Sequence, residues 1–159
     1  MKPLPSDALV AAALAAARLR AWRLGLLDVH KFLIDAERRR YERTHGPIDG
    51  PHHAFRLLMH DQEFAWLRPL ADLIVQIDER LADAGPIGPE ELNEYAARIR
   101  RRLQSQDPVT FGVPYRQALQ DEPDVVVAHG TLLRLLEGAG RPADLRPSLP
   151  DRSPADERR

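Results

Sequence analysis

Apolar residues recur at helical spacing along most of this chain, and Gly and Pro separate the runs. At 100° per residue, the clearest run places its apolar positions on one narrow stripe and its polar positions opposite. This stripe consists of Leu70, Leu73, Ile74, Ile77 and Leu81. Such a seam packs at a shallow angle against a neighbouring helix. The pattern therefore predicts a helix over residues 69–84 that faces the core of a bundle.

The same periodicity and the same helix breakers predict the remaining elements. The other expected helices cover residues 6–25, 28–45, 51–67 and 89–104, with two shorter ones that begin at Pro114 and Pro123. Gly25 is the expected stop or kink between the first two helices. No segment of useful length alternates at the period of a strand. The expected fold class is all-α, a single-domain helical bundle of five to seven helices over residues 1–138.

The two ends of the chain differ from the middle. From Gly138 onward the chain has no period, which predicts a disordered C-terminal tail over residues 139–159. The apolar run Ala8–Ala17 is about half of the ~20 residues that span a bilayer, and its flanks fit a signal peptide poorly. We therefore expect no transmembrane segment and a cytoplasmic protein.

The first helix has no single apolar stripe, because its large apolar residues are spread around it. These residues are Leu9, Val10, Leu14, Leu19 and Trp22. A helix that is apolar on most sides is either central in a bundle or covered by another subunit. This pattern is one reason to predict a homodimer.

Composition and charge exclude several classes of protein. The chain has 159 residues and no Cys, which excludes a disulfide scaffold, a Cys zinc site, an iron–sulfur cluster and a Cys nucleophile. A net charge of −1 argues against a nucleic-acid-binding protein. The charge is segmental, at +3, −6, +4 and −2 over residues 1–50, 51–95, 96–120 and 121–159. Acidic and basic helices are therefore expected to pair within one bundle or between two copies.

Several polar residues lie where the helical pattern calls for apolar ones. His30, Glu37 and Tyr41 fall inside one apolar arc, Asp61 in a second and His129 in a third. We favour a hydrogen-bonded network in the core that fixes the register of the helices. The alternative is a site for a divalent transition metal held by His30, Glu37, Asp61 and His129, with Tyr41 beside it.

The string Trp66-Leu67-Arg68-Pro69 places an indole and a guanidinium at a predicted helix break. A pocket or partner surface often lies at such a break, which makes Tyr41, Trp66 and Arg68 candidates for binding a cofactor. The alternative is a core Trp that packs over a kink. The arginine runs at residues 38–40 with Arg43, and at residues 100–102 with Arg98, are interpreted as solvated faces or as partners of the acidic region.

No catalytic motif is present, and Ser is scarce in the helical part of the chain. The sequence therefore favours a non-enzymatic cytoplasmic interaction or regulatory module that binds itself or a protein partner. The alternative is a bundle that binds a metal ion or a small cofactor through His, Glu and Asp side chains in its core.

One segment also carries a resemblance. Residues 60–70, His-Asp-Gln-Glu-Phe-Ala-Trp-Leu-Arg-Pro-Leu, and residues 73–79, Leu-Ile-Val-Gln-Ile-Asp-Glu, resemble a stretch found in an uncharacterised bacterial family of small all-helical proteins. The resemblance covers about 20 residues. It implies a bacterial, soluble, helical protein and carries no activity with it.

Overall fold

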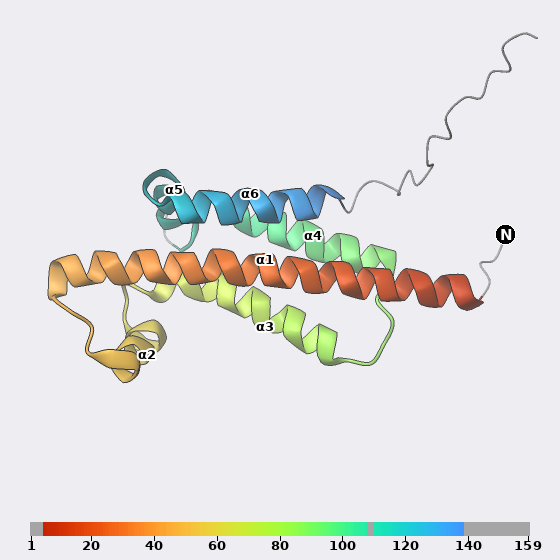
Figure 1. Ribbon diagram of the computed structural model, residues 1–159, viewed down its shortest axis with the longest axis horizontal. Helices are drawn as coiled ribbons and strands as arrows, with labels where there is room; N and C mark the ends of the chain where they lie inside the picture. Colours follow the sequence, from red (N-terminus) through yellow and green to blue (C-terminus); the bar gives the residue numbers. More distant parts are fainter. Residues whose placement is uncertain (1–4, 108–109, 139–159) are drawn as a thin grey trace, which may run out of the picture.

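A computed structural model describes residues 5–107 and 110–138, and in these ranges the chain forms six α-helices, one 3-10 turn and no strand (Figure 1). The helices are α1 (Pro5–His45), α2 (Gly50–His60), α3 (Arg68–Ala82), α4 (Pro89–Leu103), α5 (Gly112–Asp121) and α6 (Pro123–Glu137), with the turn η1 at Ala65–Leu67. This confirms the predicted all-α bundle of five to seven helices. The predicted tail over residues 139–159 lies outside the described residues.

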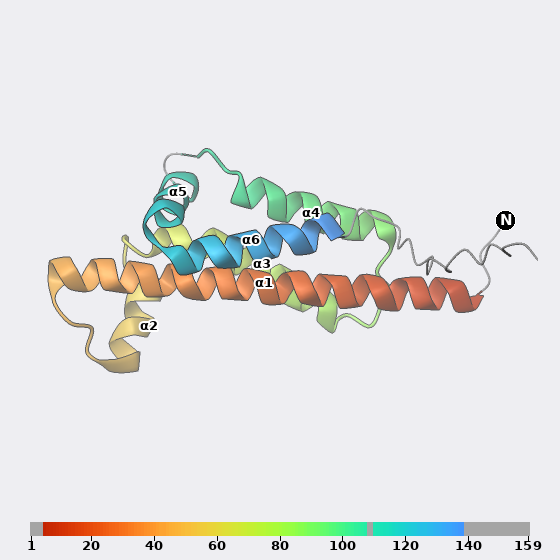
Figure 2. The same cartoon turned by 45° about the horizontal axis from the view of Figure 1, so that its top comes forward.

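The long helix α1 is the axis of the bundle. Its 41 residues extend over about 62 Å at 1.5 Å per residue. Helices α3 and α6 lie along its two sides, and α5 packs near its C-terminal half (Figures 1 and 2). Helix α2 stands away from this body and buries one residue, Leu57. The site described below is therefore built on helices that α1 holds in place.

Helix α1 does have an apolar stripe, although the sequence pattern did not separate it. Its buried residues alternate in steps of four and three, as in a coiled-coil seam. They are Ala15, Leu19, Trp22, Leu26, Val29 and Leu33. The stripe was hidden because Leu9, Val10 and Leu14 add apolar positions on other sides of the helix. Those three side chains are exposed in the structure.

The predicted break at Gly25 is wrong, because α1 continues through it to His45. A Cβ atom at Gly25 would lie 3.0 Å from Cδ1 of Leu132 on α6. Glycine inside a helix costs about 1 kcal/mol relative to Ala, so the packing must offset that cost. Gly25 therefore lies inside α1 at its contact with α6, rather than at the end of a helix.

The predicted helix over residues 51–67 is also wrong, because α2 ends at His60. Asp61 has an extended backbone, and its Oδ1 accepts a hydrogen bond from the N–H of Glu63 at 2.8 Å. This local bond offers the backbone a turn in place of another helical residue. Asp61 is consequently half-buried in a turn and does not lie in an apolar arc, as had been predicted.

The stripes predicted for the later helices are confirmed for α3 and α4. Leu70, Leu73, Ile74 and Ile77 of α3 are buried, as are Leu92, Ala96, Ile99 and Leu103 of α4. The arc on α6 is narrower than predicted, since Val126 and Leu135 are exposed. Among the described residues, no helix has the combination of length and apolar character that crossing a membrane requires.

Candidate functional site

Three arginines share one face of α4. Arg98, Arg101 and Arg102 are spaced i, i+3 and i+4, which places their side chains on neighbouring rows of the helix. The buried stripe of α4 fixes this face, because Ile99 and Leu103 turn toward the core and leave the three arginines beside α3. The helix thus presents three positive charges along one edge.

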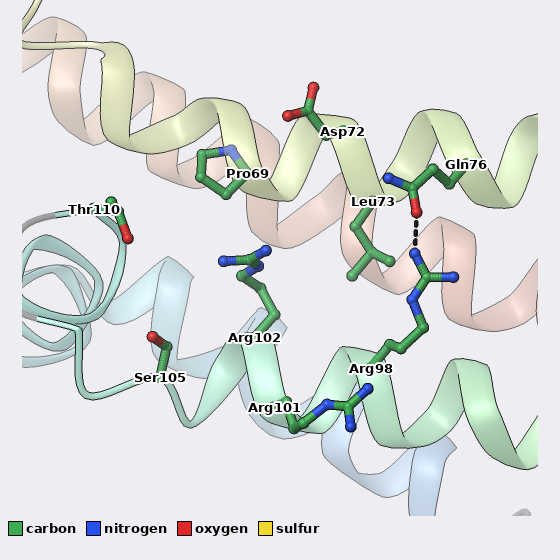
Figure 3. Close-up of a pocket in the computed structure, with 9 residues that line it drawn as sticks. All are labelled: Pro69, Asp72, Leu73, Gln76, Arg98, Arg101, Arg102, Ser105 and Thr110. Atoms are coloured by element: carbon green, nitrogen blue, oxygen red, sulfur yellow. Dashed lines mark hydrogen bonds between the residues drawn. The ribbon is translucent and has the colours of Figure 1, made fainter.

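These arginines line a groove of about 600 Å³ between α3 and α4 (Figure 3). Across the groove, α3 contributes Pro69, Asp72, Leu73 and Gln76, so the opposite wall is partly apolar and carries one carboxylate. The guanidinium group of Arg102 extends toward Pro69 and Thr110, as Figure 3 shows. The volume falls within the range of about 300–1,000 Å³ that is typical of ligand pockets.

The three guanidinium groups have no carboxylate partner among the described residues. Arg98 donates a hydrogen bond to the amide oxygen of Gln76 and lies 5.2 Å from the centre of the Tyr95 ring. Arg102 lies over Phe111 at 6.0 Å. Elsewhere, by contrast, Arg23 pairs with Asp78 and Arg80 pairs with Glu91. The groove therefore holds positive charge that the described part of the chain does not neutralise.

The loop at one end of the groove is held by a close backbone approach. The hydroxyl group of Thr110 donates to Oδ2 of Asp107 at 2.5 Å. A Cβ atom at Gly112 would lie 2.4 Å from the backbone oxygen of Ser105 and 2.8 Å from that of Asp107. Only glycine fits there without a shift of the backbone. The loop can therefore place Ser105 and Thr110 beside the arginines.

The groove has the chemistry of an anion site. Guanidinium groups donate paired hydrogen bonds to carboxylate and phosphate groups, and these charge-assisted bonds are stronger than neutral ones. The apolar surface of Pro69 and Leu73 adds room for an uncharged part of a ligand.

A second polar site lies where α1 meets η1. Glu37 is 4% exposed, and its Oε2 accepts a hydrogen bond from the indole Nε1 of Trp66 at 3.1 Å. Its Oε1 lies 3.4 Å from Nε of Arg40 but accepts no hydrogen bond from the described residues. Burial raises the pKa of Glu37, against the lowering effect of Arg40 and Trp66. A cavity of about 150 Å³ between α1 and α5 adjoins this carboxylate.

The four predicted metal ligands lie apart. Glu37 contacts Trp66, Asp61 contacts the Glu63 backbone, and the ring of His30 hydrogen-bonds to the backbone of Leu67. Nδ1 of His129 lies 2.7 Å from the hydroxyl group of Tyr115. Burial lowers the pKa of both histidines. Among the described residues no three His, Asp or Glu side chains gather to hold a metal, so the predicted centre gains no support.

The predicted cofactor-binding residues are also dispersed. Tyr41 stacks on His45 with ring centres 4.2 Å apart, and Arg68 donates to the backbone oxygen of Met59 at 2.8 Å. Trp66 alone lines a cavity, the one beside Glu37. The ring of Trp66 also lies 5.9 Å from Phe111, which stacks on Tyr115. An aromatic chain therefore connects the Glu37 cavity with His129.

The sequence reading treated the arginines of α4 as a solvated face and missed the groove. It considered three consecutive arginines, which spread around a helix. The signal lay in the spacing of Arg98, Arg101 and Arg102, which shares one edge of the amphipathic pattern. Asp72 of α3 lines the same groove, but no ion pair joins α3 to these arginines among the described residues. This could not be read from the sequence, since it depends on how two helices face each other.

The inference about function rests on the geometry described above, because comparison with known proteins adds nothing to it. The chain matches no family model, no curated protein and no solved structure.

Proposed function

We propose that this chain is a non-enzymatic helical interaction module that binds an acidic segment of a partner protein in the arginine groove between α3 and α4. The observation that carries the proposal is a groove of about 600 Å³ with three guanidinium groups that pair with no carboxylate within residues 5–107 and 110–138. A partner that supplies carboxylates would satisfy these donors. Pro69 and Leu73 would accept an apolar side chain of the same segment.

The charge around the groove favours a short acidic segment over a nucleic acid. On α3, Asp72 and Glu79 are exposed, and Glu90 and Glu94 are exposed at the start of α4. These carboxylates would repel a long polyanion such as a nucleic-acid backbone, which needs a broad basic surface. A segment of a few residues can place its charges on the arginines alone. We further propose a cytoplasmic location for the protein.

The direct test is fluorescence anisotropy with a short labelled peptide rich in Glu with Leu interspersed. We expect this peptide to bind and its Gln-substituted version not to bind. Affinity should fall as salt is added, because exposed charge pairs are screened. The double change of Arg101→Gln and Arg102→Gln should weaken binding about tenfold or more, since it removes two charge-assisted donors.

The matched control is Arg20→Gln, an exposed arginine on α1 that lies outside the groove. It changes the net charge in the same direction and should leave peptide affinity almost unchanged. Equal losses from Arg20→Gln and from the groove variants would show general charge attraction and would contradict the proposal. Binding of the Gln peptide with the affinity of the Glu peptide would contradict it as well.

Self-association through α1 is the second candidate, and one specific observation favours it. Val10, Leu14, Ala17, Ala21 and Leu24 follow one another in steps of four and three on a face away from the buried stripe. Leu14 and Leu24 are 59% and 57% exposed. This is the spacing by which two helices form a seam. Sedimentation velocity should then show a dimer that Leu14→Glu dissociates, and a monomer at every concentration would contradict it.

A further inference from the structure

The cavity beside Glu37 has an unusual wall. Glu37 is almost fully buried, and its Oε1 accepts no hydrogen bond from the described residues. A buried acceptor that receives no hydrogen bond costs about 1–3 kcal/mol of stability, and more if the group is charged. Arg40 lies near this oxygen, but it is half-exposed and its Nε at 3.4 Å does not make a hydrogen bond. A hydrogen-bond donor inside the cavity would supply the bond that Oε1 of Glu37 lacks.

The charge near Glu37 favours a positive donor. Asp61 and Glu63 are close enough that both oppose ionisation of Glu37. Asp121 and Glu122 add two carboxylates to the lining, and Arg40 and Arg43 add two guanidinium groups. Arg39 also pairs with Glu122 at 2.6 Å. A cation against Oε1 would stabilise the ionised form of Glu37. An anion at the same place would meet several carboxylates.

Part of the remaining wall is apolar, and this apolar surface favours an organic cation over a metal ion. The indole of Trp66 and the side chains of Ala36, Pro114 and Ala118 line the cavity. These groups offer no metal ligand, and the described residues form no cluster of three His, Asp or Glu side chains. An indole does favour an ammonium group near its face. The volume of about 150 Å³ equals that of an engineered cavity that binds benzene, a molecule of about six non-hydrogen atoms.

We propose that this cavity binds a small primary ammonium compound. Its N–H group donates to Oε1 of Glu37, and its short alkyl part lies against Trp66 and Ala118. This site is separate from the arginine groove and does not depend on the function proposed for it. Gln117 and Asp121 of α5 lie at the same cavity, so a bound compound would also connect α1 with α5.

The two tryptophans of the chain make a direct test possible by NMR. Nε1–H of Trp66 donates to Glu37, whereas Nε1–H of Trp22 donates to the backbone oxygen of Leu135 at 3.1 Å. Titration with n-butylammonium chloride should shift the Trp66 indole signal in a saturable way and leave the Trp22 signal in place. n-Butanol lacks the charge and tetramethylammonium lacks the N–H donor. Neither should produce the saturable shift.

Two variants and one control complete the experiment. Glu37→Gln keeps the size of the side chain and an acceptor for Trp66, and should weaken n-butylammonium binding about tenfold, as loss of a charged hydrogen bond predicts. Ala118→Leu fills the cavity without changing Glu37 and should abolish the shift. Asp28→Asn removes an exposed carboxylate from the same helix and should bind as the wild type does.

Several results would overturn the proposal. An equal response to n-butanol would mean a merely apolar cavity, and an equal response to tetramethylammonium would mean unspecific charge attraction. No movement of the Trp66 signal at saturating n-butylammonium would mean that ordered water alone satisfies Oε1. If Glu37→Gln bound n-butylammonium with wild-type affinity, the Glu37 carboxylate would not take part in binding.

Discussion

Helix α6 meets α1 through apolar and small residues, whereas α4 faces α3 through arginines. Gly25 allows Leu132 to approach the α1 backbone, and Nε1 of Trp22 donates to Leu135 across the same contact. Between α3 and α4, Arg80 pairs with Glu91, and Arg98 donates to Gln76 in a groove of about 600 Å³. All four helices bury an apolar stripe in the structure, so such a stripe alone does not decide whether two helices pack closely.

The difference comes from residues at the edges of the apolar stripes. A glycine at the edge lets two backbones approach, and long charged side chains hold helices apart while keeping their heads in water. We call the α1–α6 contact the closed contact and the α3–α4 contact the open contact. The closed contact should govern the stability of the fold, and the open contact should govern the binding of a partner. Substitutions on the two sides test this division.

The largest effect is expected from the closed side. Leu132 is fully buried beside Gly25, and Leu132→Ala should cost about 3 kcal/mol of unfolding free energy, from lost burial and the cavity that remains. Denaturant unfolding measures this loss. Val127→Ala on the same helix, at a side chain that is 66% exposed, should stay within about 0.5 kcal/mol. Similar losses at both positions would mean that the α1–α6 contact is not the tightly packed one.

The next effect is expected at the end of the open groove. Gly112→Ala places a methyl group against backbone oxygens of the 105–107 segment, which cannot rotate away, and should cost about 2 kcal/mol, as overpacking does. The displaced loop should also weaken binding of the Glu-rich peptide. Gly138→Ala, where a Cβ atom meets nothing within 4 Å, is the control for glycine replacement. A stable Gly112→Ala protein with normal peptide binding would separate this loop from the groove.

Much of the fold follows from local pattern. The stripes of α3 and α4 repeat at helical spacing, and Pro89 and Pro123 each stand in the first turn of a helix, where proline costs least. Two errors have opposite causes. Gly25 was judged by its local preference, but it lies inside α1 where Leu132 of α6 packs beside it. Asp61 was judged by helical spacing, but its side chain accepts a local hydrogen bond from the N–H of Glu63, and the helix ends there.

The candidate sites were less predictable, because they depend on pairing between distant segments. The pattern did place Glu37 in an apolar environment, and the structure buries it. Its partner Trp66 is 29 residues away, and no periodicity connects the two. For the same reason, the arginines of α4 could be located on a helix but not judged unpaired. The burial of a residue can be inferred from the pattern of its own helix. Whether a charged residue has an ion-pair partner can be judged only when the neighbouring helices are known.

A smaller effect is expected at Arg102, where one substitution should lower peptide affinity without lowering stability. Arg102 is half-buried over Phe111 and has no carboxylate partner among the described residues, and Arg98 and Arg101 repel it. Arg102→Met keeps the length of the side chain and removes that repulsion, so unfolding free energy should stay unchanged or rise by up to about 1 kcal/mol. Peptide affinity should fall in the same variant. A clear loss of stability would mean that Arg102 serves packing, and the open contact would then resemble the closed one.

The smallest expected effect is a slope with pH at Glu37. Burial raises the pKa of this carboxyl in the folded protein, so between the usual Glu value and the raised one the folded chain binds more protons than the unfolded chain. Its contribution to stability is therefore present at low pH and is lost as the pH rises through that window. His30 and His129, whose pKa values are lowered by burial, act in the opposite direction, but they are present in both proteins compared. The unfolding free energy of Glu37→Gln minus that of the wild type should thus increase with pH across the window, as measured by denaturant unfolding in a series of buffers. A decrease would mean that Arg40 and Trp66 stabilise the ionised carboxylate by more than burial costs, and the need for a further donor at Oε1 would disappear.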